Sequence, residues 1–355
     1  MATIAPIQAL LTTATCGTAS LAATAPEAAG QGGMFLQESL QRLYPDVAYQ
    51  QIVSLPPPRH LSGGKGRFDL FQVDVTFESG LERSLLIFVS RAPLLDGLYE
   101  SIAAADPGRE VSHRFGVRGR ALAEPGGTDY HLFSVDFHEG FSVFAVTDLL
   151  ERLVGVPGLE SEGRAPTESD RKRLAGWGLI PEGEEVDADR LRELLFRVDR
   201  GAVEATFRFY KTTGYFPRDP RRHNVILNVV EGRWVFRVID YEHMSPFTSP
   251  RDVLMQYYQV FETEAPDGCF VERGIRPWSW GFLDDKTGFF EGVLGGLGEE
   301  EGIEFLQAAL AEYASLPNPS GYEMEIMIHL SRFLIQRGVV FISPESTLQK
   351  SNHGS

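Results

Sequence analysis

The sequence predicts an α+β protein in which a β-rich N-terminal part precedes a mostly helical C-terminal part. Between residues 34 and 138 most segments show the alternating or continuous apolar runs of strands, as in "FDLFQVDVTF" and "RSLLIFVSR". From residue 139 onward, most segments carry apolar residues at helical spacing, and the longest begins at Asp187. Strands followed by helices, without regular alternation, are typical of the α+β class.

The composition is that of a globular protein with an acidic surface. Hydrophobic residues make up 43% and charged residues 23% of the 355 residues, and the formal net charge is -16. Because such a surface repels phosphate groups, we expect neither nucleic acid nor an anionic membrane as a partner. The two cysteines, Cys16 and Cys269, form no disulfide framework and have no metal-ligand spacing, which indicates a reducing compartment and a cytoplasmic location.

The two ends of the chain are predicted to be disordered tails. Residues 1–33 are rich in Ala, Thr and Gly, and residues 346–355 are polar. The apolar stretch "IQALL" has no basic residue before it, so a secretory signal is the less favoured alternative. No apolar run approaches the 18 or so residues that a membrane span needs.

Residues 34–138 are predicted to form a sheet with one helix inserted after its third strand. A helix, "MFLQESLQRLYPDV", ends at Pro45, and "PLLDGLYESIAAAD" forms the inserted helix with Pro93 near its first turn. The strands, in order, are "YQQIVSL", "FDLFQVDVTF", "RSLLIFVSR", "RFGVRGRALAE" and "YHLFSVDF".

After a linker near residues 138–141, the chain is predicted to be mostly helical. "FSVFAVTDLLERLVGV" is a helix, "PGLESEGRAPTESDRK" is a polar loop, and a long helix from Asp187 is closed by Gly214. "NVILNVV" and "WVFRVID" flank "EGR" and form a hairpin. The remaining helices are "SPRDVLMQYYQVFETE", "GIEFLQAALAEYASL" and "GYEMEIMIHLSRFLIQRG".

Three polar residues lie in and after the stretch "FPRDPRRHNVIL", residues 216–227. Asn224 follows Asp219 by five positions, and Asp240 follows Asn224 by sixteen, at the end of the apolar strand "VFRVI". A carboxylate at the end of a buried strand is typical of a ligand site. The alternative is that Asp219 and Asn224 are turn residues beside Pro220 and that Asp240 only ends its strand.

This order of elements and this spacing resemble the protein-kinase-like fold, as in aminoglycoside and other small-molecule phosphotransferases. In that family a D-x-x-x-x-N loop follows a long helix, and the second of two short strands ends in a metal-binding Asp. "IDYE" here is closer to the "IDxE" of small-molecule phosphotransferases than to the "DFG" of protein kinases. The resemblance covers roughly residues 45–345.

The resemblance implies a two-lobed molecule: residues 34–138 form a nucleotide-covering lobe with a small antiparallel sheet, and residues 139–345 form a larger helical lobe. It implies an ATP- and Mg²⁺-dependent phosphotransferase in which Asp219 is the catalytic base for an acceptor hydroxyl. Asn224 and Asp240 would hold Mg²⁺ through oxygen atoms. The expected partners are a nucleotide and a small molecule or protein with a hydroxyl group; the acceptor and the oligomeric state stay open.

The sequence departs from the kinase pattern at its third strand. "SLLIFVS" lacks the Lys that contacts ATP phosphates in protein kinases, and the cations nearest to it are Arg83 and Arg91. Glu100, in the inserted helix, matches the Glu that pairs with that Lys; here its partner would be Arg91, or it is a solvated charge. Loss of the Lys also leaves open a pseudokinase, a binding or regulatory module without catalysis.

A Gly-rich segment offers another cation. "SGGKG" places Gly63, Gly64, Lys65 and Gly66 where a phosphate-covering loop belongs, and glycines let backbone N–H groups approach phosphates. Lys65 would then supply the missing charge, as in the with-no-lysine kinases. The alternative is a flexible hairpin turn.

Other polar and aromatic residues are expected to have structural roles. His223 is predicted to be exposed on its loop. His113, His131 and His138 lack the spacing of metal ligands, so no metal site is expected there. The tryptophans of "RPWSWGF", residues 276–282, are predicted to pack in a core.

Overall fold

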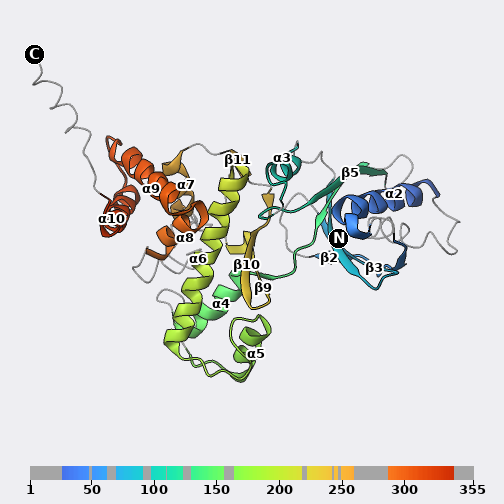
Figure 1. The fold of residues 1–355 in the computed structure, drawn as a ribbon, viewed down its shortest axis with the longest axis horizontal. Helices are drawn as coiled ribbons and strands as arrows, with labels where there is room; N and C mark the ends of the chain where they lie inside the picture. The colour runs from blue at the N-terminus through green and yellow to red at the C-terminus, as the bar shows by residue number, and fades with distance from the viewer. Residues whose placement is uncertain are drawn as a thin grey trace, which may run out of the picture. The chain divides into compact units, whose positions relative to one another are not determined.

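The computed structural model describes residues 26–47, 50–61, 69–90, 97–108, 110–122, 129–155, 164–217, 222–241, 244–246, 249–259 and 287–339. The chain divides into two compact units, residues 1–139 and 140–355 (Figure 1). Antiparallel sheets and helices occur together, which confirms the α+β class. No helix within the described ranges is long and apolar enough to cross a bilayer.

Unit 1, residues 1–139, is built on an antiparallel sheet of six described strands. Its strands run in the order β1-β3-β4-β6-β5, and β2 also pairs with β3. The predicted strands are all present, whereas β2 was not predicted. Their bounds are Ile52–Ser54 (β1), Arg59–Leu61 (β2), Asp69–Phe77 (β3), Glu82–Ser90 (β4), Phe115–Leu122 (β5) and Asp129–Asp136 (β6).

Two helices cover opposite faces of this sheet. Helix α2 (Pro26–Leu43) packs Phe35 and Leu40 against the face that carries Ile87. Helix α3 (Leu98–Ala105) packs Tyr99 on Phe133, with ring centroids 4.6 Å apart. Because successive residues of a strand point to opposite faces, and Phe133 is paired with the residue after Ile87, the two helices lie on different sides.

Helix α2 begins at Pro26, whereas the sequence had predicted a helix only from Met34 and a disordered tail up to residue 33. The packed second half of the helix explains the difference, since adding turns to an existing helix is far less costly than starting one. Proline is also well suited to a first helical turn. The close approach of α2 to β5 requires glycine at position 119, because a Cβ there would lie 2.7 Å from the ring of Phe35.

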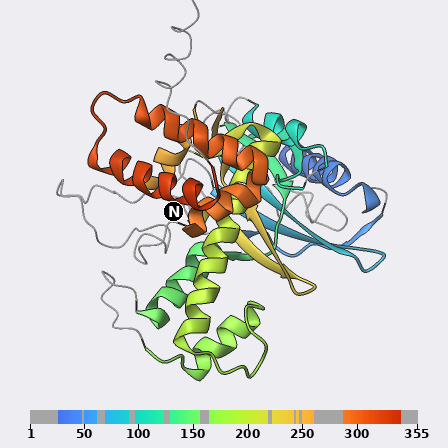
Figure 2. The same cartoon turned by 60° about the vertical axis from the view of Figure 1, so that its left-hand side comes forward.

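Unit 2, residues 140–355, is organised around helix α6 (Ala188–Thr213). As predicted, Asp187 caps its start by accepting a hydrogen bond from the backbone of Arg190, and Gly214 ends it in the left-handed conformation. Figure 2 shows the C-terminal helices beside α6: α8 packs directly on it, and α9 and α10 pack on α8. The other helices are α4 (Val143–Val154), α5 (Glu168–Gly176), α7 (Pro250–Gln259), α8 (Thr287–Leu297), α9 (Glu299–Ala314) and α10 (Gly321–Gln336).

Two of these helices were not predicted. Helix α5 lies in the segment expected to be a polar loop, and its start is fixed by a capping box between Thr167 and Asp170. Helix α8 contains several glycines, which lower helix propensity. Those glycines allow close packing: a Cβ at Gly296 would lie 2.5 Å from Cβ of Phe207 on α6.

The predicted hairpin is formed by β9 (Val225–Val230) and β10 (Arg233–Val238). Its turn is made by Glu231 and Gly232, both with positive φ, which suits the twist of a two-residue hairpin. Strand β7 (Phe141–Ser142) pairs with the other edge of β9. A second small sheet pairs β8 (Tyr215–Pro217) with β11 (Met244–Pro246).

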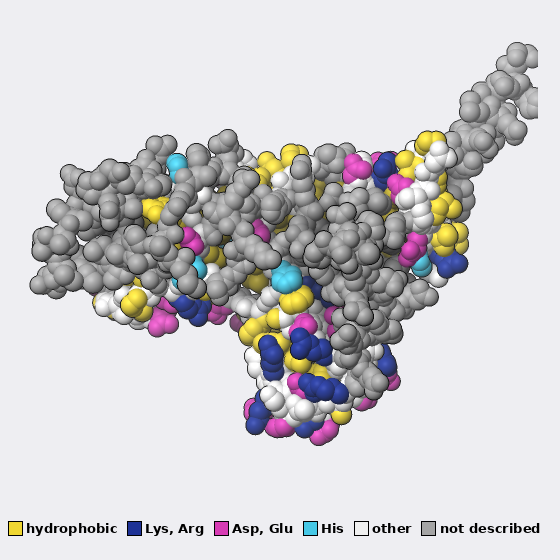
Figure 3. Space-filling model, turned by 180° about the vertical axis from the view of Figure 1, so that it is seen from behind, with side chains coloured by type: hydrophobic (Ala, Val, Ile, Leu, Met, Phe, Trp, Pro, Cys, Tyr) yellow, Lys and Arg dark blue, Asp and Glu magenta, His cyan; other side chains and the backbone are white. Residues whose placement is uncertain are grey.

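Charges of both signs are interspersed around α5 and the start of α6. The view in Figure 3 shows Lys and Arg side chains beside Asp and Glu side chains at this lower end of the molecule. Ion pairs within one helix account for several of them, including Arg171 with Glu168 and Arg192 with Asp189. Exposed pairs of this kind stabilise a helix only slightly, so this surface is a solvated one. The predicted Trp cluster, residues 276–282, lies outside the described residues.

Candidate functional site

The hairpin brings the backbones of Asn224 and Asp240 together. Its last register pair joins Val225 to Val238, and one more bond follows, from the backbone N–H of Ile239 to the carbonyl of Asn224 at 2.8 Å. Asp240 is the next residue after this bond. Two residues sixteen positions apart in sequence therefore lie at the same end of one rigid ribbon.

Asp240 has a strained backbone. Its φ is 63°, in the left-handed region that residues other than glycine seldom adopt. The residues on both sides hold it there: Ile239 is bonded to Asn224, and Tyr241 is buried with its ring 5.3 Å from Phe209 of α6. Such strain is concentrated at functional sites, where the surrounding structure maintains it. The side chain of Asp240 is exposed, so it can meet a ligand.

The loop before the hairpin is anchored by Arg222, a buried arginine that sequence reasoning missed. Its guanidinium donates to both oxygens of Asp199 on α6, at 2.9 and 2.7 Å, and to Oε1 of Glu151 on α4, at 2.6 Å. Only 3% of its side chain is exposed. Arg222 is two residues before Asn224, so this cluster fixes the start of the hairpin to two helices at once.

The cluster holds one positive group between two carboxylates. Burial raises the pKa of Glu151 to about 7; the charge of Arg222 opposes this shift, and the charge of Asp199 adds to it. Arg222 donates two hydrogen bonds to Asp199 and one to Glu151.

His223 and the segments around the loop are also held in place. The ring of His223 stacks on Phe144 of α4, with centroids 3.9 Å apart, although the residue is exposed as predicted. Strand β8 ends at Pro217, just before Asp219, and β11 begins at Met244, shortly after Asp240. Because Met244 is paired with Pro217, the two chain segments that lead into and out of the site are hydrogen-bonded to each other.

The other predicted site residues lie outside the described residues. These are Asp219, the glycines and lysine of the Gly-rich segment (Gly63, Gly64, Lys65 and Gly66) and Arg91. Their roles stay predictions. The Gly-rich segment connects β2 to β3, two strands that pair with each other.

Glu100 of α3 has a partner that the sequence did not indicate. Arg118 of β5 donates to both carboxylate oxygens, and the Nη2–Oε2 distance is 2.6 Å. Burial by itself would raise the pKa of Glu100, but the hydrogen bond and charge of Arg118, a backbone hydrogen bond and the charge of Arg42 together lower the pKa. Glu100 is therefore a partly exposed helix charge that pairs with Arg118, and the predicted pairing with Arg91 lies outside the described residues.

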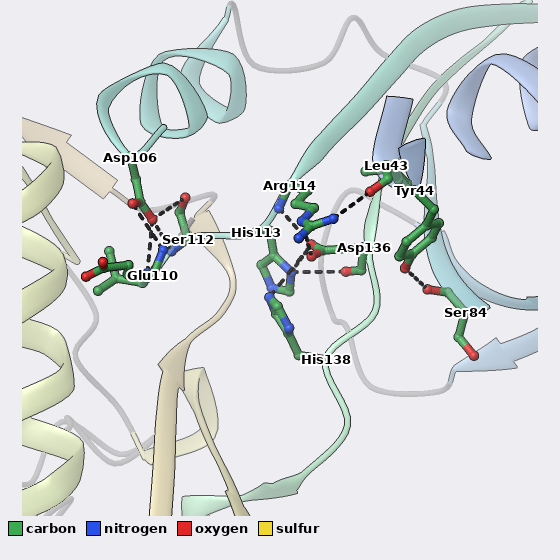
Figure 4. A network of polar contacts seen from close by, with 11 residues as sticks. Leu43, Tyr44, Ser84, Asp106, Glu110, Ser112, His113, Arg114, Asp136 and His138 are labelled. Atoms are coloured by element: carbon green, nitrogen blue, oxygen red, sulfur yellow. Dashed lines mark hydrogen bonds and ion pairs between the residues drawn. The ribbon is translucent and has the colours of Figure 1, made fainter. Parts of the chain in front are cut away.

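Unit 1 holds a second polar cluster, made by His113, Asp136 and His138 (Figure 4). Nδ1 of His113 lies 3.3 Å from Oδ1 of Asp136 and 3.1 Å from its backbone oxygen; Nε2 of His138 lies 3.7 Å from the same Oδ1. The imidazole rings are 4.3 Å apart. The spacing of these histidines in the sequence did not indicate this cluster, because pairing of the chain around β5 and β6 brings distant positions together.

The pKa of Asp136 is lowered although its carboxyl group is buried. Burial raises its pKa, but the hydrogen bond and charge of His113, the charge of His138 and the backbone N–H of Arg114 lower it below the ordinary value. That N–H donates to Oδ1 at 2.7 Å. The carboxylate is thus oriented by the backbone and faces two imidazoles.

Comparison with known proteins leaves the family open. No protein-family model matches the chain, and no curated protein matches it. Among solved structures, one match is a chain of "WaaP in complex with acyl carrier protein", with 13% identity, a TM-score of 0.33, and coverage of 85% of this chain and 95% of that chain. A similarity at this level establishes no activity, so the argument for function depends on the residues themselves.

Proposed function

We propose that the protein is an ATP- and Mg²⁺-dependent phosphotransferase of the protein-kinase-like fold, acting on a hydroxyl group of a small molecule or a protein. The observation that carries the proposal is the open end of the β9–β10 hairpin, opposite its Glu231–Gly232 turn. At this end Asn224 lies beside the strained, exposed Asp240, and in the sequence Asp219 precedes Asn224 by five positions.

The donor atoms near the hairpin end suit Mg²⁺. One carboxylate and one amide oxygen are hard ligands, and so small a set leaves room for phosphate oxygens and water, which Mg²⁺ retains in nucleotide sites. Asn224 and Asp240 would hold the ion, and a bound Mg²⁺ would neutralise charge on the transferred phosphoryl group. Asp219 would orient the acceptor hydroxyl and accept its proton.

The anchoring of the loop supports this assignment. Phosphoryl transfer depends mainly on positioning and electrostatics, so the groups involved must be preorganised. Arg222, two residues before Asn224, is tied to α4 and α6, and β8, which ends two residues before Asp219, pairs with β11.

The proposal predicts that nucleotide and metal stabilise the protein together. ATP with Mg²⁺ should raise the melting temperature more than ATP with EDTA, because binding to the native state at a hundredfold excess over Kd adds about 2.7 kcal/mol. Differential scanning fluorimetry with ATP–Mg²⁺, ATP–EDTA and Mg²⁺ alone measures this. Absence of any shift with ATP–Mg²⁺ would contradict the proposed function.

A pseudokinase is the second candidate function. It is favoured by β4, which carries no lysine, and by Glu100, which is already paired with Arg118. A protein of this kind would bind nucleotide without transferring its phosphate. An equal thermal shift with and without Mg²⁺, together with no ATP consumption, would support this candidate over the first.

Because β4 has no lysine, Lys65 and Arg91 are the two candidates for the cation that contacts the ATP phosphates. If Lys65 contacts the phosphates, Lys65→Ala should weaken ATP binding by tenfold or more, as loss of a charged hydrogen bond of about 1.5–3 kcal/mol requires. Arg91→Ala tests the other candidate, and Arg59→Ala is a control on the neighbouring strand β2. Isothermal titration with ATP–Mg²⁺ is the measurement. If neither Lys65→Ala nor Arg91→Ala changes the affinity, no cation replaces the lysine and the pseudokinase candidate gains.

A further inference from the structure

The cluster of His113, Asp136 and His138 has the composition of a metal site. It offers two imidazole nitrogens and one carboxylate oxygen, and one such atom from each residue lies within 4.8 Å of the others. Zn²⁺ and similar first-row ions bind this combination in three-ligand sites, in which a fourth position stays open to water. None of these residues belongs to the hairpin site.

Two of the three donor separations are close to those around one small ion, and the third is within 4.8 Å. A tetrahedron with bonds of about 2.0–2.1 Å has edges of roughly 3.3–3.4 Å. The observed separations from Oδ1 of Asp136 are 3.3 Å to Nδ1 of His113 and 3.7 Å to Nε2 of His138. The second is longer than a hydrogen bond but close to such an edge, so hydrogen bonding explains one contact and not the other. Small side-chain movements would complete the geometry.

The sheet holds His113 and Asp136 on a rigid frame. Asp136 is the last residue of β6, and His113 and Arg114 directly precede β5. The two segments are bonded to each other in both directions: the N–H of Asp136 donates to the carbonyl of Arg114 at 3.2 Å, and the N–H of Arg114 donates to Oδ1. A hydrogen-bonded carboxylate is the usual state of a metal-binding one, because the bond fixes its orientation.

Burial and charge allow an ion at this position. The side chains of His113, Asp136 and His138 are 7%, 11% and 15% exposed. The cluster is therefore largely buried but keeps some contact with solvent. The competing cation is Arg114, whose Nε lies 4.0 Å from Oδ2 and whose Nη1 donates instead to the carbonyl of Leu43. The guanidinium is therefore directed away from the face of Asp136 that meets the histidines (Figure 4).

We propose that unit 1 binds a divalent first-row transition-metal ion through His113, Asp136 and His138, and that Zn²⁺ is a suitable probe for it. The alternative is that the cluster is only an ion pair between a histidine and an aspartate. The site would be independent of the proposed phosphotransferase activity, because its ligands and its chemistry differ from those of Asn224 and Asp240.

Titration of the full-length, EDTA-treated protein with Zn²⁺ tests the proposal. We expect one tight site per chain, and His138→Ala should weaken it by at least tenfold, since even groups that merely support a ligand change affinity by 10–100-fold. His131→Ala, in the same strand β6 as Asp136, is the matched control and should leave binding intact. Asp240→Asn should also leave it intact, and Mg²⁺ should not compete.

Co²⁺ provides a second readout that does not depend on stability. Its visible absorption reports coordination by nitrogen and oxygen atoms in a tetrahedral site, and it should be present in the wild type and in His131→Ala but absent in His138→Ala. His138→Ala is preferred to a change at His113 because its side chain is the more exposed, so the fold should survive. No Zn²⁺ binding, or binding that His138→Ala leaves unchanged, would overturn the proposal.

Discussion

Replacing Arg222 by methionine is expected to lower the free energy of unfolding by about 3–5 kcal/mol. The substitution keeps much of the volume but removes the only described cation that contacts Asp199, a residue with no exposed surface, and Glu151, which is 7% exposed. Two buried carboxylates would then lose this cation, which costs far more than losing a surface pair. Urea denaturation followed by circular dichroism measures the change.

The two carboxylates should respond differently to neutralisation. Glu151→Gln removes one of two negative charges and keeps an oxygen that can accept from Arg222, so its cost should be small. Asp199→Asn loses the carboxylate that receives two hydrogen bonds and should cost clearly more. If Arg222→Met costs less than about 1 kcal/mol, or Glu151→Gln costs more than Asp199→Asn, the account of the cluster is wrong.

The free energy of unfolding should also depend on pH, because of Glu151. The pKa of Glu151 is raised from 4.5 to about 7, so the folded protein holds a proton that the unfolded chain has lost within this range. This contribution to stability is fully present below about pH 4.5 and is lost as the pH rises through about 7. The decrease of the free energy of unfolding with rising pH should be smaller in Glu151→Gln. An unchanged decrease would contradict the raised pKa of Glu151.

Local patterns in the sequence predicted much of the fold. Helix α6 was found because its apolar spacing is regular and because Asp187 and Gly214 mark its ends. The β9–β10 hairpin was found from two apolar strands around "EGR". Helix α8 was missed because its glycines disfavour a helix locally, and only the packing against α6 explains them.

The side-chain clusters could not be predicted in the same way. Arg222 is 71 positions from Glu151 and 23 from Asp199, so no local pattern connects them. The same holds for His113 and His138, which meet only because the chain around β5 and β6 pairs. The sequence did contain one signal for Arg222. Asp199 lies within the apolar face of α6, and a buried aspartate needs a partner such as an arginine.

Asp240→Asn is expected to abolish Mg²⁺-dependent nucleotide binding, whereas Asp219→Asn should leave binding largely intact and lower the rate by about 10²–10⁴-fold. The difference follows from position. Asp240 directly follows the last bond of the hairpin and is held at φ 63° between Ile239 and the buried Tyr241, as a preorganised metal ligand requires. Asp219 lies on the loop before Arg222, between two prolines, where the resemblance to kinases places the group that receives the hydroxyl proton.

Isothermal titration with ATP–Mg²⁺ and an ATP-consumption assay on both variants separate the two roles. Asp148→Asn is the matched control, because Asp148 is an aspartate of the same unit that pairs with Arg152 one turn along α4. Its loss should change neither binding nor rate, since an exposed pair of this kind contributes about 0–1 kcal/mol. If both site variants lose nucleotide binding equally, Asp219 is a ligand and not a base. If neither loses anything, the hairpin end does not hold Mg²⁺, and the strain at Asp240 needs another explanation than metal binding.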